Sequence, residues 1–361
     1  MDKILQEFDD KKQTFESFSK ILKSLVESLL VSEGISVHSI SCRVKDKGSL
    51  RKKIIKKQRY EKISDITDIV GVRIITHYSD EVDKVASIIE SEFDIDESNS
   101  IDKRKTLEPD RFGYLSLHYV ASLREDRCKL KEYLLFKGMK AEFQVRSILQ
   151  HTWAEIEHDI GYKSSKEVPN HIRRQFSQLA GLLEIADTQF IAIKESLQSY
   201  KEDSAAKIEY IADDVTIDKI TLTEYFKKSK TINEIKETLR SQLKVELTDD
   251  FSVGFNYLVE ALAYLKIESI GRLNKELEGL KDLTIKRISD FSNALSQGEE
   301  HVVSLPPLVL ITALSQVIAA KDGDLESVIK FLSRDKTQFP NVNIHAISEY
   351  LVSNYSLNKS V

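Results

Sequence analysis

The first residues that could do chemistry lie in a basic stretch near the N-terminus. Eight lysines and arginines fall between residues 43 and 58, in a chain whose formal net charge is −5. Arg43 and Lys45 are two residues apart, which places both on one side of a strand. Lys53 follows Ser49 by four residues, on a predicted helix that has Ser49 as its N-cap and whose N-terminus favours anions. Converging cations can hold a triphosphate, although a solvated basic helix face would have the same pattern.

An aspartate and an arginine belong to the next apolar run, which is predicted to be a buried strand from Ile69 to Ile75. Asp68 stands at the mouth of this strand. Mg²⁺ prefers one or two carboxylates together with phosphate oxygens, so Asp68 is a candidate metal ligand. Arg73 lies inside the strand, where its guanidinium could stack on an adenine or bind a phosphate. A salt bridge at the strand edge would explain either residue equally well.

Two later segments alternate polar and apolar residues. In the segment from residue 112 to 118 the polar residues share one face of a predicted strand, and they are Tyr114, Ser116 and His118. An aromatic ring, a hydroxyl and an imidazole in a row could contact a base, a ribose and a phosphate. A half-exposed amphipathic strand would alternate in the same way.

The second alternating segment runs from residue 141 to 146. Glu142, Gln144 and Arg146 take one face, and Phe143 and Val145 take the other. A carboxylate beside a metal–nucleotide site could deprotonate a hydroxyl nucleophile or share the metal. The alternation alone is common in ordinary strands.

A predicted helix follows this strand. His151, Glu155 and His158 lie at i, i+4 and i+7 on one face of it and could imitate a metal site. Their order is not that of a zinc protease, so structural hydrogen bonding or support of the preceding strand is the favoured interpretation. The pair His158 and Asp159 is poor evidence for a metal phosphohydrolase.

These residues need a sheet to position them. The first 165 residues alternate strand and helix patterns, which predicts an α+β fold with a mixed sheet flanked by helices. The predicted strands are 37–44, 69–75, 114–121 and 139–145, and the predicted helices are 4–32, 50–57, 81–93, 147–162 and 170–200.

The chain is long enough for two domains. We expect a first domain with flanking helices over residues 1–200, a polar linker over 201–216 and an all-α domain over 217–361. The paired helices of the last region are compatible with a short solenoid. No catalytic cluster stands out in it, so oligomerisation, regulation or a plain structural role are all open.

The composition excludes several classes of protein. Hydrophobic residues make up 41% and charged residues 31%, as in globular domains, and the net negative charge excludes a uniformly basic surface. The two cysteines give no disulfide framework or metal ligand set. No apolar run approaches the roughly 18–20 residues that span a bilayer, and the start does not look like a signal peptide. We therefore expect a cytoplasmic protein without membrane contact.

Taken in order, the chemical groups resemble the synthetase domain of the RelA/SpoT alarmone-synthetase family over about residues 35–165. Five stretches in the same order and with sensible gaps make the resemblance specific. The matching stretches are Arg43–Lys45 with Ser49 and Lys53, Asp68–Arg73, Gly113–His118, Glu142–Arg146 and His151–His158.

The resemblance implies a nucleotidyltransferase-like fold and a role for each residue. Arg43 and Arg73 would sandwich the adenine of ATP, and Asp68 would bind Mg²⁺. Glu142 would complete the metal site or activate the acceptor hydroxyl, and Tyr114 would stack on the acceptor base. The remaining roles are phosphate binding by Lys45, Ser49 and Lys53, and acceptor ribose and phosphate binding by His118, Gln144 and Arg146, with Ser116 on the same face.

The resemblance also implies an activity, the Mg²⁺-dependent transfer of pyrophosphate from ATP to the 3′-hydroxyl of GDP or GTP. About 35 residues precede the matching region, so the HD hydrolase domain of the long family members is not expected. A toxin-type member that pyrophosphorylates the tRNA 3′ end or an adenine nucleotide is the main alternative. Residues 50–58 and 103–105 could then bind a tRNA backbone.

Two further possibilities concern the rest of the molecule. The fold could be a catalytically retired binding module, although the chemically competent metal and base positions argue against it. The C-terminal domain could form a homo-oligomer, bind a regulatory protein partner or restrain a toxic N-terminal domain.

Overall fold

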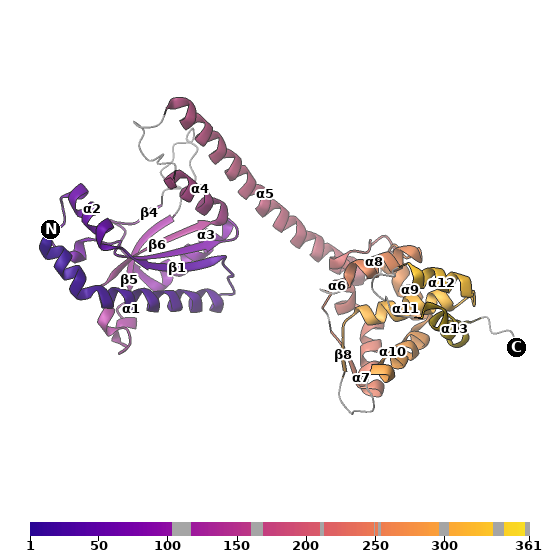
Figure 1. Ribbon diagram of the computed structural model, residues 1–361. Coiled ribbons are helices and arrows are strands. Elements are labelled where there is room, and N and C mark those ends of the chain that lie inside the picture. Colours follow the sequence, from indigo (N-terminus) through magenta and orange to yellow (C-terminus); the bar gives the residue numbers. More distant parts are fainter. Residues whose placement is uncertain are drawn as a thin grey trace. The chain divides into compact units, whose positions relative to one another are not determined.

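The computed structural model describes residues 1–102, 117–159, 169–209, 213–248, 250–251, 254–295, 303–334 and 343–357. The chain divides into two compact units, Met1–Glu195 and Ser196–Val361 (Figure 1). Each unit has its own hydrophobic core.

A mixed sheet organises the first unit. Its strands lie in the order β1-β2-β6-β5-β3, and β4 also pairs with β5. β2 and β6 are parallel, and the other pairs are antiparallel. The strands are β1 (Ser39–Val44), β2 (Val70–Thr76), β3 (Phe93–Ile95), β4 (Ile101–Asp102), β5 (Leu117–Leu123) and β6 (Lys140–Ser147). The predicted mixed sheet is confirmed.

Helices cover one face of this sheet. α1 (Asp2–Ser32) contacts β1 and β2, and α3 (Asp80–Glu92) contacts β6 (Figure 1). The apolar residues of the strands, such as Val72 and Phe143, are fully buried against them. Strand residues with the opposite parity point to the other face, because side chains alternate along a strand. That second face is where the polar residues of the alternating segments must lie.

Shorter elements complete the first unit. α2 (Lys47–Lys57) follows β1, and α4 (Ile148–Asp159) follows β6. Three 3₁₀ turns lie at Ile63–Asp65, Arg127–Lys129 and Leu134–Phe136.

The start of α2 differs from the prediction. Asp46, not Ser49, is its N-cap, because the Asp46 carboxylate accepts the Ser49 backbone N–H at 2.8 Å. An aspartate is as good a cap as a serine, and its charge also suits the positive end of the helix dipole. The helix therefore begins at Lys47 rather than at Leu50.

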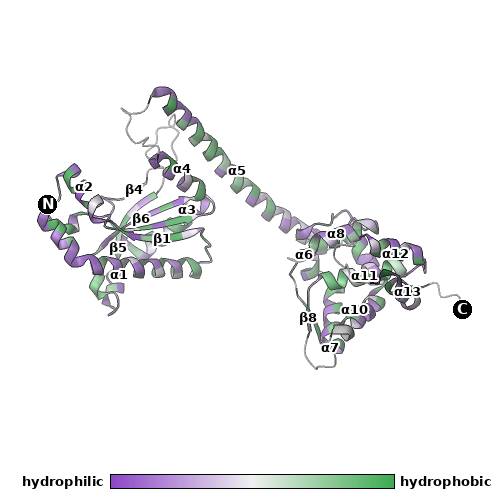
Figure 2. Ribbon diagram, in the orientation of Figure 1, coloured by the Kyte–Doolittle hydropathy of each residue, from purple (hydrophilic) through white to green (hydrophobic). Residues whose placement is uncertain are grey.

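The long helix α5 (Asn170–Glu209) also differs, since it was expected to end near Tyr200. Residues 201–209, placed in the predicted linker, are helical, because lysine, glutamate and alanine favour helices and because Ala205 and Ile208 are buried on one face of this last part of α5. Figure 2 shows hydrophobic and hydrophilic residues alternating along α5. The division between the two units falls within this helix, after Glu195.

The second unit is helical, as predicted. Its helices are α6 (Lys219–Lys228), α7 (Lys230–Leu243), α8 (Phe255–Tyr264), α9 (Ile270–Gly279), α10 (Lys281–Leu295), α11 (Leu308–Ala320), α12 (Leu325–Ser333) and α13 (Ile344–Tyr355). A short parallel pair, β7 (Val245–Leu247) and β8 (Val303–Leu305), joins them. α11 is apolar on nearly all sides and is the most buried helix of this core. None of the described helices combines the length and apolarity needed to cross a membrane.

The two cores lead to a stability prediction. Phe143→Ala removes a fully buried ring from the first core and should lower its free energy of unfolding by about 3–5 kcal/mol. Trp153, the only tryptophan of the chain, is buried against Phe176 in the first unit, so its fluorescence reports on that unit. A denaturant titration followed by Trp153 fluorescence should show this loss as a lower midpoint concentration for the unfolding of the first unit.

Leu314→Ala is the matched control, because Leu314 is fully buried in the second core. It should leave the Trp153 transition in place and shift only the loss of helical circular dichroism. An equal shift of the Trp153 transition in both variants would contradict separate cores.

Candidate active site

The strand register brings six predicted site residues onto the face of the sheet opposite α1 and α3. Residues paired across neighbouring strands point to the same side. One row of Cα partners runs Arg43–Gly71–Glu142–Val120, and the next runs Ser41–Arg73–Gln144–His118. Arg146 continues the polar side of β6 by two residues. Two segments about seventy residues apart in sequence, β2 and β6, thus supply the middle of the site.

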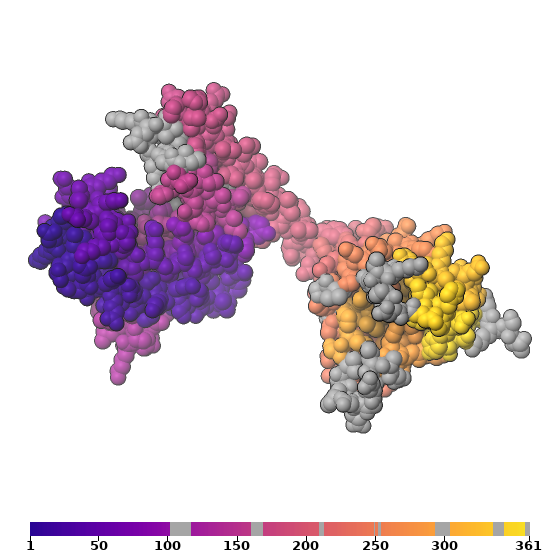
Figure 3. Space-filling model, viewed as in Figure 1, coloured from indigo at the N-terminus to yellow at the C-terminus, as the bar shows by residue number. Residues whose placement is uncertain are grey.

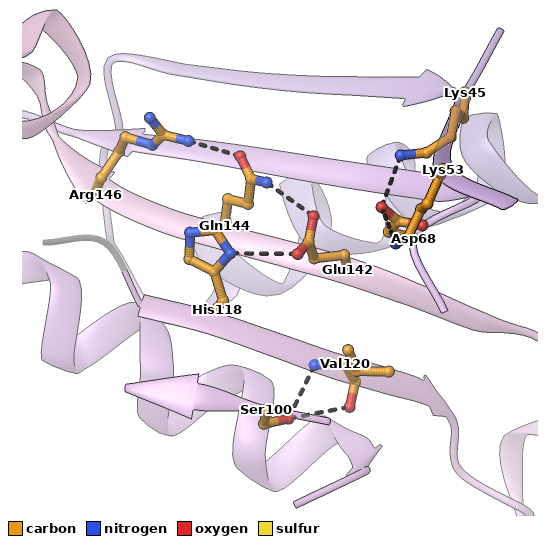
Figure 4. A network of polar contacts seen from close by, with 9 residues as sticks. All are labelled: Lys45, Lys53, Asp68, Ser100, His118, Val120, Glu142, Gln144 and Arg146. Carbon is orange, nitrogen blue, oxygen red and sulfur yellow. Dashed lines mark hydrogen bonds and ion pairs between the residues drawn. The ribbon is translucent and has the colours of Figure 1, made fainter. Parts of the chain in front are cut away.

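Asp68 lies between two lysines at the edge of this face (Figure 4). Its Oδ2 atom is 2.7 Å from the Nζ of Lys45 and 2.7 Å from the Nζ of Lys53. The Asp68 side chain is 18% exposed, and its Oδ1 atom is buried without a hydrogen-bond partner. The cations that follow β1 and lie on α2 therefore converge on one carboxylate.

Glu142 is the centre of a chain of hydrogen bonds along β6 (Figure 4). His118 Nδ1 lies 3.3 Å from Glu142 Oε1, and Gln144 Nε2 donates to Glu142 Oε2 at 2.8 Å. Arg146 Nη2 donates in turn to Gln144 Oε1 at 2.6 Å. These contacts fix the orientation of the carboxylate and point it across the sheet.

The pKa of Glu142 is lowered to about 2. Burial by itself raises this pKa, but the hydrogen bond and charge of His118 outweigh it, with help from Gln144 and the charge of Lys53. Glu142 is therefore ionised at neutral pH and carries its charge in a partly buried place.

Arginines gather beside this carboxylate. Arg146 is only 5% exposed, and burial together with the charges of Arg73 and Arg43 lowers its pKa to about 10. Its Nε atom is buried without a hydrogen-bond partner. Such a concentration of positive charge on one sheet face favours an anionic ligand.

Arg73 has an ion-pair partner that the sequence did not suggest. Its Nη1 atom lies 3.0 Å from Glu155 Oε1, on α4. His151 Nδ1 is 3.7 Å from the same oxygen. Burial and the charges of Arg146 and Arg73 lower the pKa of His151. The sequence favoured a structural role for Glu155 and left a salt bridge open for Arg73, but it could not pair the two residues, because the packing of α4 against β2 is not visible in the helix spacing.

Gly71 is a second residue to which the sequence assigned no role. It stands between Arg43 and Glu142 in the register, and a Cβ atom there would lie 3.7 Å from the Arg43 side chain. Because Gly71 has no side chain, no atom of this residue stands between the Arg43 guanidinium and the Glu142 carboxylate on this face. A glycine inside an otherwise β-branched strand is the signal that could have identified it.

The other predicted residues are placed as follows. Ser49 is exposed in the first turn of α2, with its backbone N–H already bonded to Asp46. Tyr114 and Ser116 lie outside the described residues, as does the segment 103–105. Within the described part of the chain, no three His, Cys, Asp or Glu side chains form a metal-binding group. That finding does not bear on a Mg²⁺ site of two carboxylates.

Part of the first unit is similar in sequence to known proteins. Residues 42–167 match the family model described as the region found in RelA / SpoT proteins. The GTP pyrophosphokinase YwaC of Bacillus subtilis is 29% identical over 159 residues, which are 43% of this chain and 72% of YwaC. The GTP pyrophosphokinase YjbM of the same organism is 26% identical over 164 residues, covering 45% of this chain and 74% of YjbM.

A solved structure is also similar to part of this chain. The crystal structure of small alarmone synthetase 2 from Bacillus subtilis has 25% sequence identity and a TM-score of 0.43, and the match covers 53% of this chain and 99% of that one. The resemblance drawn from the motifs is confirmed by the match of residues 42–167 to the RelA/SpoT family model and by the two sequence relatives.

Proposed function

We propose that the first unit transfers the pyrophosphate of ATP to the 3′-hydroxyl of GDP or GTP, producing AMP and the alarmone (p)ppGpp. The observation that carries the proposal is the shared sheet face, on which the Asp68–lysine cluster, the arginines and the ionised Glu142 meet. The homologous GTP pyrophosphokinases support the choice of substrates.

The donor half of the site is built from Arg43, Arg73, Lys45 and Lys53. The two arginines occupy adjacent rows on β1 and β2, which suits contacts with the two faces of an adenine. The two lysines would exchange the carboxylate of Asp68 for the phosphate oxygens of ATP. Both the backbone N–H and the side chain of Ser49 contact the Asp46 carboxylate, so the Ser49 hydroxyl would turn away from Asp46 to reach a phosphate.

Asp68 fits a Mg²⁺ ligand. Its Oδ1 atom is buried and has no hydrogen-bond partner, so it can accept a cation without breaking a contact. The Oδ2 atom becomes available when the lysines turn to the phosphates. Bound Mg²⁺ would neutralise charge on the phosphate oxygens during transfer.

Glu142 suits the acceptor side of the reaction. A carboxylate with a pKa of about 2 is a weak general base, since efficient proton abstraction needs a pKa nearer the working pH. We therefore assign Glu142 to holding the acceptor hydroxyl and sharing the metal. His118 and Gln144 position it, and the buried Arg146 acts through Gln144. Tyr114 and Ser116 keep their proposed places beside the acceptor.

A second candidate acceptor is the 3′ end of tRNA. The observation that favours it is the exposed basic side of α2, formed by Arg51, Lys52, Lys56 and Lys57. Such a surface suits a nucleic-acid backbone, whose binding depends on contacts between cations and phosphates.

The expected homo-oligomer or regulatory partner also stays a proposal. The exposed apolar side chains of α5, which include Leu182, Ile185, Ile193 and Leu197, are the surface that suits such an association.

The acceptor assay tests the proposed function. Purified full-length protein is incubated with Mg²⁺ and ATP labelled in the γ-phosphate, together with GDP, GTP, ATP alone or bulk tRNA in separate reactions. We expect label in guanosine tetra- or pentaphosphate and release of AMP. Glu142→Gln should lower kcat by at least about a hundredfold, because the carboxylate contacts the reacting centre.

Glu132→Gln is the matched control, because Glu132 is an exposed carboxylate in the turn between the last two 3₁₀ elements. It should keep the wild-type rate. Label appearing only in tRNA would establish the second candidate, and no transfer to any acceptor would refute the enzymatic proposal.

Asp68→Asn tests the metal assignment. If Asp68 binds Mg²⁺, the Mg²⁺ concentration for half-maximal rate should rise by about tenfold or more. ATP affinity measured in EDTA should not fall, because Lys45 and Lys53 lose only a competitor for the phosphates. Asp94→Asn, at an exposed position on β3, is the control. An unchanged Mg²⁺ requirement would mean that Asp68 only anchors the two lysines.

Glu155→Gln tests whether Arg73 contacts ATP. In the structure Arg73 is engaged by Glu155, and a partly exposed ion pair of this kind is worth about 0.2–1 kcal/mol. Removing the charge of Glu155 should therefore lower the KM for ATP by about 1.4-fold to fivefold. Glu155→Gln combined with Arg73→Ala should lose this gain. A lower KM that persists without Arg73 would contradict the donor assignment.

A further inference from the structure

The second unit contains a cavity that the proposed reaction does not use. Its volume is about 370 Å³, within the range of sites that hold small ligands. α8, α10, α11, α12 and α13 contribute its walls, together with β8. Most of the lining is aliphatic or aromatic, as at Phe291, Leu308 and Ile347. The space therefore suits an apolar body.

Arg334 brings a positive charge to this apolar wall. Its Nε, Nη1 and Nη2 atoms are all buried, and none has a hydrogen-bond partner. The guanidinium carbon lies 4.5 Å from the ring centroid of Phe331, 5.2 Å from that of Tyr257 and 5.7 Å from that of Tyr264. Aromatic faces can hold the cation in place, but they leave all of its N–H donors unsatisfied.

A second guanidinium lines the same cavity. Arg287 is 7% exposed, and its carbon lies 4.0 Å from the ring centroid of Phe291. Its Nε atom donates to Gln316 Oε1 at 2.8 Å, and Gln316 is also part of the lining. Among the described residues that line the cavity, none carries a carboxylate. The described lining of the cavity therefore has two positive charges and no negative one.

We propose that this cavity is a binding site for a small amphipathic anion. A carboxylate or phosphate head group would accept hydrogen bonds from the planar donors of Arg334 and the neighbouring Arg287, which suit such groups. A hydrocarbon or aromatic body would fill the space between the helices. The anion would accept the hydrogen bonds that the Arg334 donors lack. A bound anion would therefore explain why this charge is buried without a partner in the protein.

Three probes with the same hydrocarbon body test the head group. Octanoate, octyl phosphate and 1-octanol are titrated into the full-length protein by isothermal titration calorimetry. We expect saturable binding of at least one anion, with a Kd at least tenfold lower than that of 1-octanol. The stronger of the two anions identifies the head group as a carboxylate or a phosphate ester.

Arg334→Met separates a ligand site from a structural arginine. Methionine keeps an apolar chain beside the three rings but removes the buried charge. The variant should lose the preference for the anion over 1-octanol, and without added probe its second unit should melt at the same or a higher temperature than the wild type. Lys330→Gln, an exposed charge change on the same helix, should alter neither binding nor melting.

Any of three results would overturn the proposal. The first is that neither octanoate nor octyl phosphate binds the wild-type protein more tightly than 1-octanol does, and the second is that Arg334→Met keeps the preference for the anion. The third is that Arg334→Met lowers the melting temperature while neither anion raises that of the wild type, which would make Arg334 a structural residue. Both readouts are independent of pyrophosphate transfer by the first unit.

Discussion

The parallel pairing of β2 with β6 is the constraint on which the site of the first unit depends. It sets Gly71 opposite Glu142 and Arg73 opposite Gln144, and the antiparallel neighbours add Arg43 and His118 to the same rows. A slip of one residue would turn these polar side chains into the core and bring Phe143 to the surface. Because the apolar strand residues are buried under α1 and α3, the polar residues between them must lie together on the opposite face, where they form the site.

The charged groups of that face are balanced by partners that a nucleotide can replace. Asp68 is held by two lysines and Arg73 by Glu155. Glu142 is instead held by His118 and Gln144, which lie on the same sheet face. The first two contacts are exchangeable for phosphates or a base. The third is a fixed hydrogen-bond network, and fixed dipoles at a reacting centre need no reorganisation during the reaction. The side chains of the donor half are thus held by exchangeable ion pairs, whereas Glu142 in the acceptor half is held by a fixed hydrogen-bond network.

Local patterns in the sequence predicted much of this. The period of two in β6 placed Glu142, Gln144 and Arg146 on one face, because pleating dictates that parity. The predicted N-cap of α2, Ser49, was wrong. Asp46 and Ser49 are both favourable N-cap residues, so the sequence does not show which of them caps the helix. The Arg73–Glu155 pair and the cavity around Arg334 could not be predicted, because each joins elements whose contact depends on tertiary packing. The continuation of α5 through residues 201–209 was missed for a similar reason, because the burial of Ile208 in the second core depends on tertiary packing.

The central claim is that one sheet face binds both nucleotides. A crystal structure of the full-length protein with Mg²⁺, a non-hydrolysable ATP analogue and GDP tests it most directly. The account predicts the adenine between Arg43 and Arg73, the phosphates on Lys45 and Lys53, and the acceptor 3′-hydroxyl beside Glu142. Nucleotide density away from this face, with Asp68 still paired to both lysines, would contradict it.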